Sequence, residues 1–160
     1  MKHFSYKGHF IQASSRDEAI KIVAEKLKLQ PISTPIKSKY LFHRSPPATR
    51  ASITKQGLLP KIGDSYKEHW DGHFKPNELT KGVFLSDGRI YDTTYDDDLW
   101  VIEVSKLDKT KLFKDPDNYL TDCLLYTGKI PTSAIKLVYE GSGEADVNNV
   151  PEKEILRKYK

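Results

Sequence analysis

The sequence predicts an α+β fold in which a β-sheet dominates and helices are few. Four runs rich in β-branched and aromatic residues follow one another between positions 82 and 140, and Gly, Pro and Asp turn signals separate them. Helical periodicity is weak over the same stretch, and the clearest helical pattern lies near the N-terminus. A chain of 160 residues with 38% hydrophobic residues suits one domain with an appendage.

The first segment, 1–36, predicts a small strand and helix unit. The run HFSYKGHFIQA alternates in polarity around a glycine turn, and Ser15 with Glu18 three residues later is typical of a capping box. The helix that follows, DEAIKIVAEKLKL, carries apolar residues at helical spacing. Pro31 and Pro35 then break the helix and separate this unit from the rest of the chain.

The positive charge of the chain is concentrated at this end. Residues 1–40 hold 8 Lys and Arg against 3 Asp and Glu, a net charge of +5, which leaves 18 against 19, or −1, for residues 41–160. Such a unit attracts phosphate groups or an acidic partner, and solvated lysines on a small amphipathic unit explain the same excess. The second interpretation is the favoured one.

The composition also predicts the cellular compartment of the protein. A single cysteine, Cys123, excludes an internal disulfide and the zinc motifs built on cysteine pairs. No apolar stretch approaches the roughly 18 residues that cross a bilayer, and the first ten residues lack the apolar core of a signal peptide. We therefore expect a soluble cytoplasmic protein without a membrane partner.

The second segment, 37–141, is expected to open with a strand over 39–43 and a helix of about three turns. Ser45 is the predicted cap, Pro46 suits the first turn, and Gly57 ends the helix. His43 then lies at the end of a strand beside a helix N-terminus, where free N–H groups favour anions. It is either a ligand contact or a histidine satisfied in the core.

The remaining elements follow from the same signals. The last segment, 142–160, is a polar tail with a short helix from Pro151, which we expect to be peripheral. The strands are predicted at 82–86, 99–105, 123–127 and 134–140.

No metal site is predicted. His69 and His73 have a spacing that suits a ligand pair on a helix, but Gly72 and Pro76 favour a loop. The run 96–98, three aspartates, lacks the spacing of a calcium loop and is interpreted as a solvated turn.

Taken together, several short motifs resemble the ADP-ribosyltransferase fold, in particular its small bacterial and phage members with an H-Y-[E/D] type of site. They are a strand ending in His43, a serine two residues on, a helix of the form xxASIxxxGLxP, the GVFLS strand and the final YTGKIPTSAIKLV. The resemblance covers residues 39–139. It implies a split β-sheet that binds NAD, used as a substrate, between its two halves.

The resemblance also implies binding residues. His43 matches the histidine that hydrogen-bonds a ribose hydroxyl of the adenosine, and Ser45 offers a second polar contact. Phe84 stands where the family usually has Tyr, and Tyr95 follows after ten intervening residues; these rings are expected to sandwich the nicotinamide. Core packing is the alternative interpretation of Phe84.

The catalytic acid is expected a few residues before the last motif. Breaking the bond from nicotinamide to ribose builds positive charge on the sugar, which a carboxylate stabilises. The position falls on Asp122, and Glu103 is the second choice if the alignment is shifted.

Two classes of function follow. The first is an enzyme, such as a toxin or phage effector, that transfers ADP-ribose from NAD to a protein or nucleic acid, with the basic unit 1–36 helping to choose the target. The second is a catalytically inactive module of the same fold that binds a nucleotide, a nucleic acid or a protein. A related enzyme class is the RNA 2′-phosphotransferases of this fold, in which His43, Arg44 and Arg50 would hold a phosphate.

Overall fold

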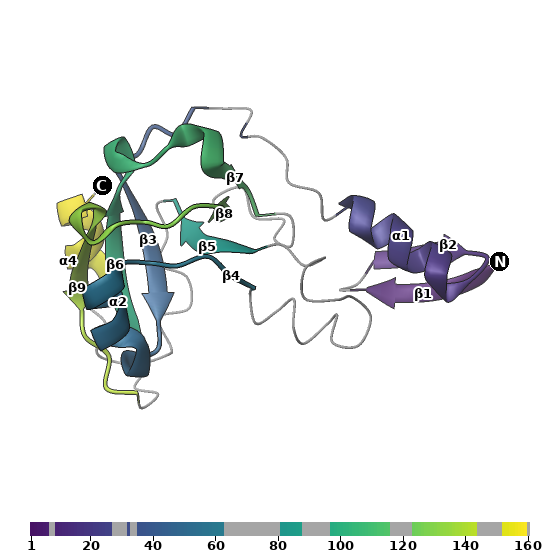
Figure 1. The fold of residues 1–160 in the computed structure, drawn as a ribbon, viewed down its shortest axis with the longest axis horizontal. Helices are drawn as coiled ribbons and strands as arrows, with labels where there is room; N and C mark the ends of the chain where they lie inside the picture. Colours follow the sequence, from purple (N-terminus) through teal and green to yellow (C-terminus); the bar gives the residue numbers. More distant parts are fainter. Residues whose placement is uncertain are drawn as a thin grey trace.

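The computed structural model describes residues 1–6, 9–26, 32, 35–62, 81–87, 97–115, 123–143 and 152–159. Over these ranges the chain is a mixed α/β protein with one two-stranded and one seven-stranded sheet (Figure 1). Every strand pairing in them is antiparallel, and the helices are few. The predicted α+β class is confirmed at this level.

The N-terminal unit is a hairpin covered by one helix. Its elements are β1 (Lys2–Tyr6), β2 (His9–Ala13) and α1 (Arg16–Lys26), and Figure 1 draws them apart from the larger sheet. Ile11, Ala13 and Ala19 are its buried residues among those described. The strand and helix unit predicted from the sequence is therefore present.

The start of α1 is capped as the sequence predicts. The backbone N–H of Glu18 donates to the Ser15 hydroxyl at 3.2 Å. The Glu18 carboxylate in turn accepts from the backbone N–H of Ser14 at 2.6 Å and from the Ser14 hydroxyl. The bond to Ser15 satisfies a donor that the first helical turn leaves without a partner. The two bonds from Ser14 lower the pKa of Glu18.

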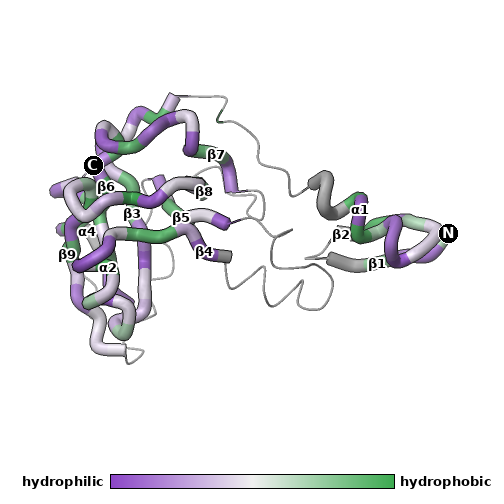
Figure 2. The backbone as a smooth tube through the Cα atoms, in the orientation of Figure 1, coloured by the Kyte–Doolittle hydropathy of each residue, from purple (hydrophilic) through white to green (hydrophobic). Residues whose placement is uncertain are grey.

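The larger sheet has the strand order β7-β8-β5-β3-β6-β9, with β4 paired to β5 outside this path. Hydrophobic and hydrophilic residues both occur along its strands (Figure 2). The strands predicted downstream are present, although the one over 99–105 ends early because Val104–Lys106 forms a 3₁₀ turn. The strand bounds are β3 (Tyr40–Ser45), β4 (Lys61–Ile62), β5 (Lys81–Ser86), β6 (Asp98–Glu103), β7 (Leu112–Lys114), β8 (Cys123–Tyr126) and β9 (Ile135–Tyr139).

A helix packs on each face of the sheet. On one face, Ile53 of α2 (Arg50–Gln56) joins a core cluster with Leu41, Trp100 and Ile102. On the other, α4 (Glu152–Tyr159) buries Ile155 against Phe42, Leu99 and Val101. Successive residues of β3 and β6 alternate between the two clusters, as the pleat of a strand requires. The helix of the polar tail thus covers one sheet face, which its composition did not predict.

The segment after β3 differs from the prediction. Ser45 is the last residue of β3 and caps no helix, and the chain passes through a 3₁₀ turn, Pro47–Thr49, before α2 begins. The helix is therefore shorter than predicted. Gly57 does end it, with a φ of 81° that favours glycine. A Cβ there would lie 2.2 Å from the Ile130 carbonyl oxygen, so the close approach of these two segments also requires glycine.

Candidate functional site

The candidate site lies where β3 and β5 separate. Toward β6, β3 forms six residue pairs, from Tyr40 with Glu103 to Ser45 with Asp98. Toward β5 it forms a single pair, Phe42 with Ser86. The sheet is thus continuous on one edge of β3 and opens on the other, directly before His43.

The side chain of His43 bridges this opening. Its Nδ1 atom lies 2.7 Å from the backbone carbonyl oxygen of Phe84 on β5. A carbonyl oxygen only accepts, so Nδ1 carries the proton and donates. In the neutral ring, Nε2 is then an acceptor, and it has no hydrogen-bond partner among the described residues.

Burial keeps this imidazole neutral. It lowers the pKa of His43 below the ordinary value of 6.5, and the hydrogen bond to Phe84 offsets part of this effect. The positive charge of Lys61, on the short strand β4, lowers the pKa further. At neutral pH the ring therefore presents an acceptor at Nε2 and no charge.

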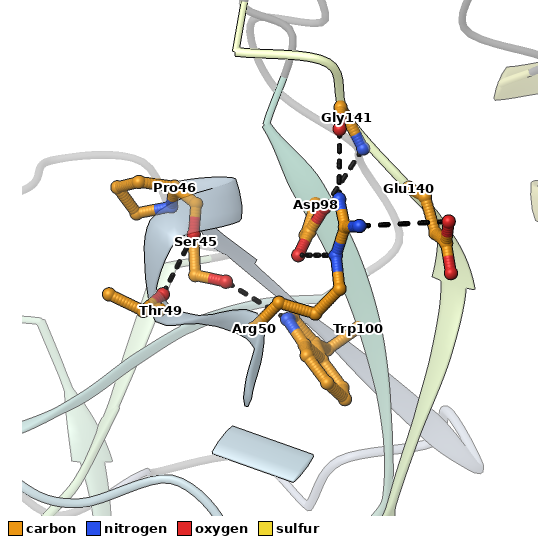
Figure 3. Close-up of polar contacts among 8 residues, drawn as sticks. All are labelled: Ser45, Pro46, Thr49, Arg50, Asp98, Trp100, Glu140 and Gly141. Carbon is orange, nitrogen blue, oxygen red and sulfur yellow. Dashed lines mark hydrogen bonds and ion pairs between the residues drawn. The ribbon is translucent and has the colours of Figure 1, made fainter. Parts of the chain in front are cut away.

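The hydroxyl of Ser45 is part of the core. Ser45 is buried, and its Oγ accepts a hydrogen bond of 2.9 Å from the indole Nε1 of Trp100 (Figure 3). The contact joins β3 to β6 across the ladder. The residue predicted as a second ribose contact thus already has a structural partner, which sequence reasoning missed.

An ion pair with a buried carboxylate holds α2 to the edge of β3 that faces β6. Arg50 donates to both carboxylate oxygens of Asp98, from Nε at 2.8 Å and from Nη2 at 2.6 Å (Figure 3). The same Nη2 donates to the Gly141 carbonyl at 2.8 Å, and the Gly141 N–H donates to Asp98 at 2.9 Å. Glu140 lies 3.6 Å from Nη1. Three segments, α2, β6 and the end of β9, therefore meet at Asp98.

These contacts correct one interpretation of the sequence. Of the three aspartates interpreted as a solvated turn, Asp98 is the first residue of β6 and has no exposed surface. Asp97 pairs with Arg44 at 3.3 Å, both side chains being partly exposed. The hydrogen bonds to Asp98 raise the pKa of Arg50, and a guanidinium so engaged has a structural role.

Phe84 reaches His43 through its main chain. Val83 and Leu85 on either side of it are buried in the core, while Phe84 itself is only partly buried. Because neighbouring residues of a strand point to opposite faces, the Phe84 ring lies on the face away from those two core residues. Its stacking role stays a prediction.

Glu103 lies away from His43. Glu103 is the last residue of β6 and lies three positions from Trp100, the residue that pairs with His43. Glu103 and His43 are therefore separated by about 10 Å along the strands, and their side chains lie on opposite faces of the sheet. Its carboxylate accepts from Lys106 and from Ser105, both at 3.0 Å, and these hydrogen bonds lower its pKa. Glu103 instead lines a separate cleft of about 350 Å³.

Tyr95 and Asp122 lie outside the described residues, as do His69 and His73. The first described residue after Asp122 is Cys123, which pairs with Ser86. In the part of the chain that the structure describes, no group of three or more His, Cys, Asp or Glu side chains could hold a metal ion. No helix there is long and apolar enough to cross a membrane.

Comparisons of the chain with protein-family models, with curated proteins and with solved structures found no match.

Proposed function

We propose that the chain is an NAD-dependent ADP-ribosyltransferase that transfers ADP-ribose from NAD to a macromolecular acceptor. The observation that carries this proposal is the opening between β3 and β5, bridged by the neutral ring of His43. A sheet that separates beside the strand bearing this histidine agrees with the split sheet that the resemblance implies. The mostly antiparallel architecture with few helices is compatible with it.

The chemistry of His43 suits a ribose. Because Nδ1 donates to Phe84, the unprotonated Nε2 can accept a hydrogen bond from a ribose hydroxyl. A neutral ring performs this role without placing a positive charge beside the sugar. Stacking of the Phe84 ring on the nicotinamide stays a prediction from the sequence.

Asp122 remains the acid that the resemblance implies, and the contacts of Glu103 argue against the second choice. Glu103 lies on the sheet face opposite to His43, and its carboxylate is bound by Lys106. A carboxylate near the ribose would stabilise the positive charge that develops as nicotinamide leaves.

The test uses NAD labelled in its adenylate phosphate. The protein is incubated with labelled NAD and a cell lysate, and label transferred to protein and to nucleic acid is measured separately. Asp122→Asn is expected to lower transfer by at least about 100-fold, since one electrostatic contact to a transition state is worth that much. His43→Ala is expected to weaken NAD binding measured by calorimetry. Glu103→Gln is the matched control and should leave transfer unchanged.

The same measurements distinguish the second class of function. A protein that binds NAD through His43 but transfers no label is a binding module. A protein that neither binds nor consumes NAD contradicts the proposal.

A further inference from the structure

Five exposed lysines lie on segments that connect strands of the larger sheet: directly before β3, between β6 and β7, and after β8. They come from three separate stretches of sequence. We call them the lysine patch: Lys39, Lys106, Lys109, Lys111 and Lys129.

Backbone and side-chain contacts bring these stretches together. The backbone N–H of Val104 donates to the Lys39 carbonyl at 2.9 Å, and Lys106 Nζ donates to the Ser133 carbonyl at 2.8 Å. The N–H of Thr127 donates to the Lys111 carbonyl, also at 2.9 Å. The Lys111 side chain lies over Gly128, because a Cβ at that glycine would meet Lys111 Cδ at 2.9 Å. The three stretches that carry the lysines are therefore neighbours in the fold.

Most of this positive charge is not neutralised. Lys106 pairs with Glu103 at 3.0 Å, but the other four lysines form no ion pair within 4 Å in the described ranges. The nearby Asp108 accepts from the backbone N–H and the hydroxyl of Thr110, as the cap of a 3₁₀ turn. Five lysines against Glu103 and Asp108 leave a local net charge of +3.

Two lysines of the patch line a hollow. Lys39 and Lys109 line the cleft of about 350 Å³ together with the hydroxyl-bearing Ser38 and Ser105, and Tyr40, Glu103 and Val104 complete its lining. Ammonium and hydroxyl groups donate to phosphate oxygens. We propose that the lysine patch binds the phosphate backbone of a nucleic acid, with the cleft receiving a nucleotide of the bound strand.

The surface suits a nucleic acid better than a lipid bilayer. Membrane-binding surfaces combine lysines with large apolar side chains that enter the lipid. Within the part of the chain described, only Met1 and Leu59 are large hydrophobic residues with high exposure, and neither belongs to the patch. The inference is independent of the use of NAD, since it concerns binding alone.

Fluorescence anisotropy of a labelled single-stranded oligonucleotide of about 20 residues tests this proposal with the full chain. The double variant Lys109→Ala and Lys111→Ala is expected to weaken binding at least 10-fold at about 50 mM salt. It should also reduce the slope of log K against log salt by about 1.4, because each lost phosphate contact on a single strand contributes about 0.7.

A matched double variant removes the same charge elsewhere. Lys55→Ala and Lys81→Ala affect exposed lysines of α2 and β5 and should leave affinity and slope close to those of the wild type. A third variant, Lys2→Ala with Lys21→Ala, tests the basic N-terminal unit. Equal binding by the wild type and the patch variant would overturn the inference. So would a loss confined to the N-terminal variant, or binding to phosphatidylserine vesicles without binding to the oligonucleotide.

Discussion

The two edges of β3 are held by different kinds of contact. On the β6 side, six backbone pairs are reinforced by the Trp100 to Ser45 hydrogen bond and by the Arg50–Asp98 ion pair just beyond the strand. On the β5 side, one backbone pair is followed by the ring of His43. Strand β3 is thus fixed along one edge by β6, and its other edge is joined to β5 through the imidazole of His43.

Because β6 pairs with β3 along its whole length, β3 keeps its position even where β5 no longer pairs with it. The imidazole occupies the place of a further backbone pair and offers a second nitrogen, which no backbone pair could do. We expect substitutions on the fixed edge to change stability, and substitutions on the open edge to change binding and pH dependence.

The largest effect is expected at Asp98. Asp98→Ala removes a fully buried carboxylate that accepts from Arg50 and from Gly141. We expect a loss of about 3 kcal/mol of unfolding free energy, the lower end of the range for breaking a buried pair, because the guanidinium left behind reaches solvent. Urea unfolding followed by circular dichroism measures this loss.

Asp97→Ala is the matched control for that measurement. Asp97 also pairs with an arginine, Arg44, but both side chains are partly exposed. Such pairs contribute about 0 to 1 kcal/mol, so this variant should unfold close to the wild type. Equal losses in the two variants would show that the buried pair does not fix this edge.

A smaller effect is expected at the hydrogen bond between β3 and β6. Trp100→Phe and Ser45→Ala each leave one buried polar group without its partner. A double-mutant cycle on unfolding free energies should give a coupling of about 1 kcal/mol, the usual net value of a buried hydrogen bond. Additive losses would mean that this contact adds nothing to the pairing of the two strands.

The sequence predicts the strands better than their partners. Local patterns reveal β5 and β8 almost to the residue because alternation and turn residues act over a few positions. The pairing order and the opening beside β3 depend on contacts between residues far apart in sequence, such as Phe42 with Ser86, which local patterns do not carry. The docking of α4 shows the same limit, because a polar tail hides a few apolar residues that meet a sheet face.

The site residues show the same limit. His43 stands out in the sequence because the predicted strand ends on it, where folding does not require a histidine, although β3 continues to Ser45. Asp98 does not, because its arginine lies 48 positions away and its neighbours are also aspartates. The charge count likewise assigns the positive excess to residues 1–40, although four of the five lysines in the patch come from the segment with net charge −1.

The last effect is the pH dependence of the unfolding free energy, which we expect from His43 on the edge of β3 that faces β5. Burial lowers the pKa of His43 below 6.5, so between 6.5 and the lowered value the unfolded chain binds a proton that the folded chain does not. The contribution of the neutral ring to stability is therefore present above pH 6.5 and is lost as the pH falls through that interval. The expected slope is at most about 1.4 kcal/mol per pH unit, measured by urea unfolding between pH 8 and 5.

His43→Gln should remove this slope while keeping a side-chain N–H that can donate to the Phe84 carbonyl. Because glutamine does not titrate, the stability of the variant should vary less between pH 7 and 5.5 than that of the wild type. His3→Gln, at an exposed position of β1, controls for the loss of any histidine and should retain the wild-type slope. If His43→Gln and the wild type lose stability in parallel, the ring is not held neutral by burial. The open edge of β3 would then differ from the fixed edge only in its backbone pairing.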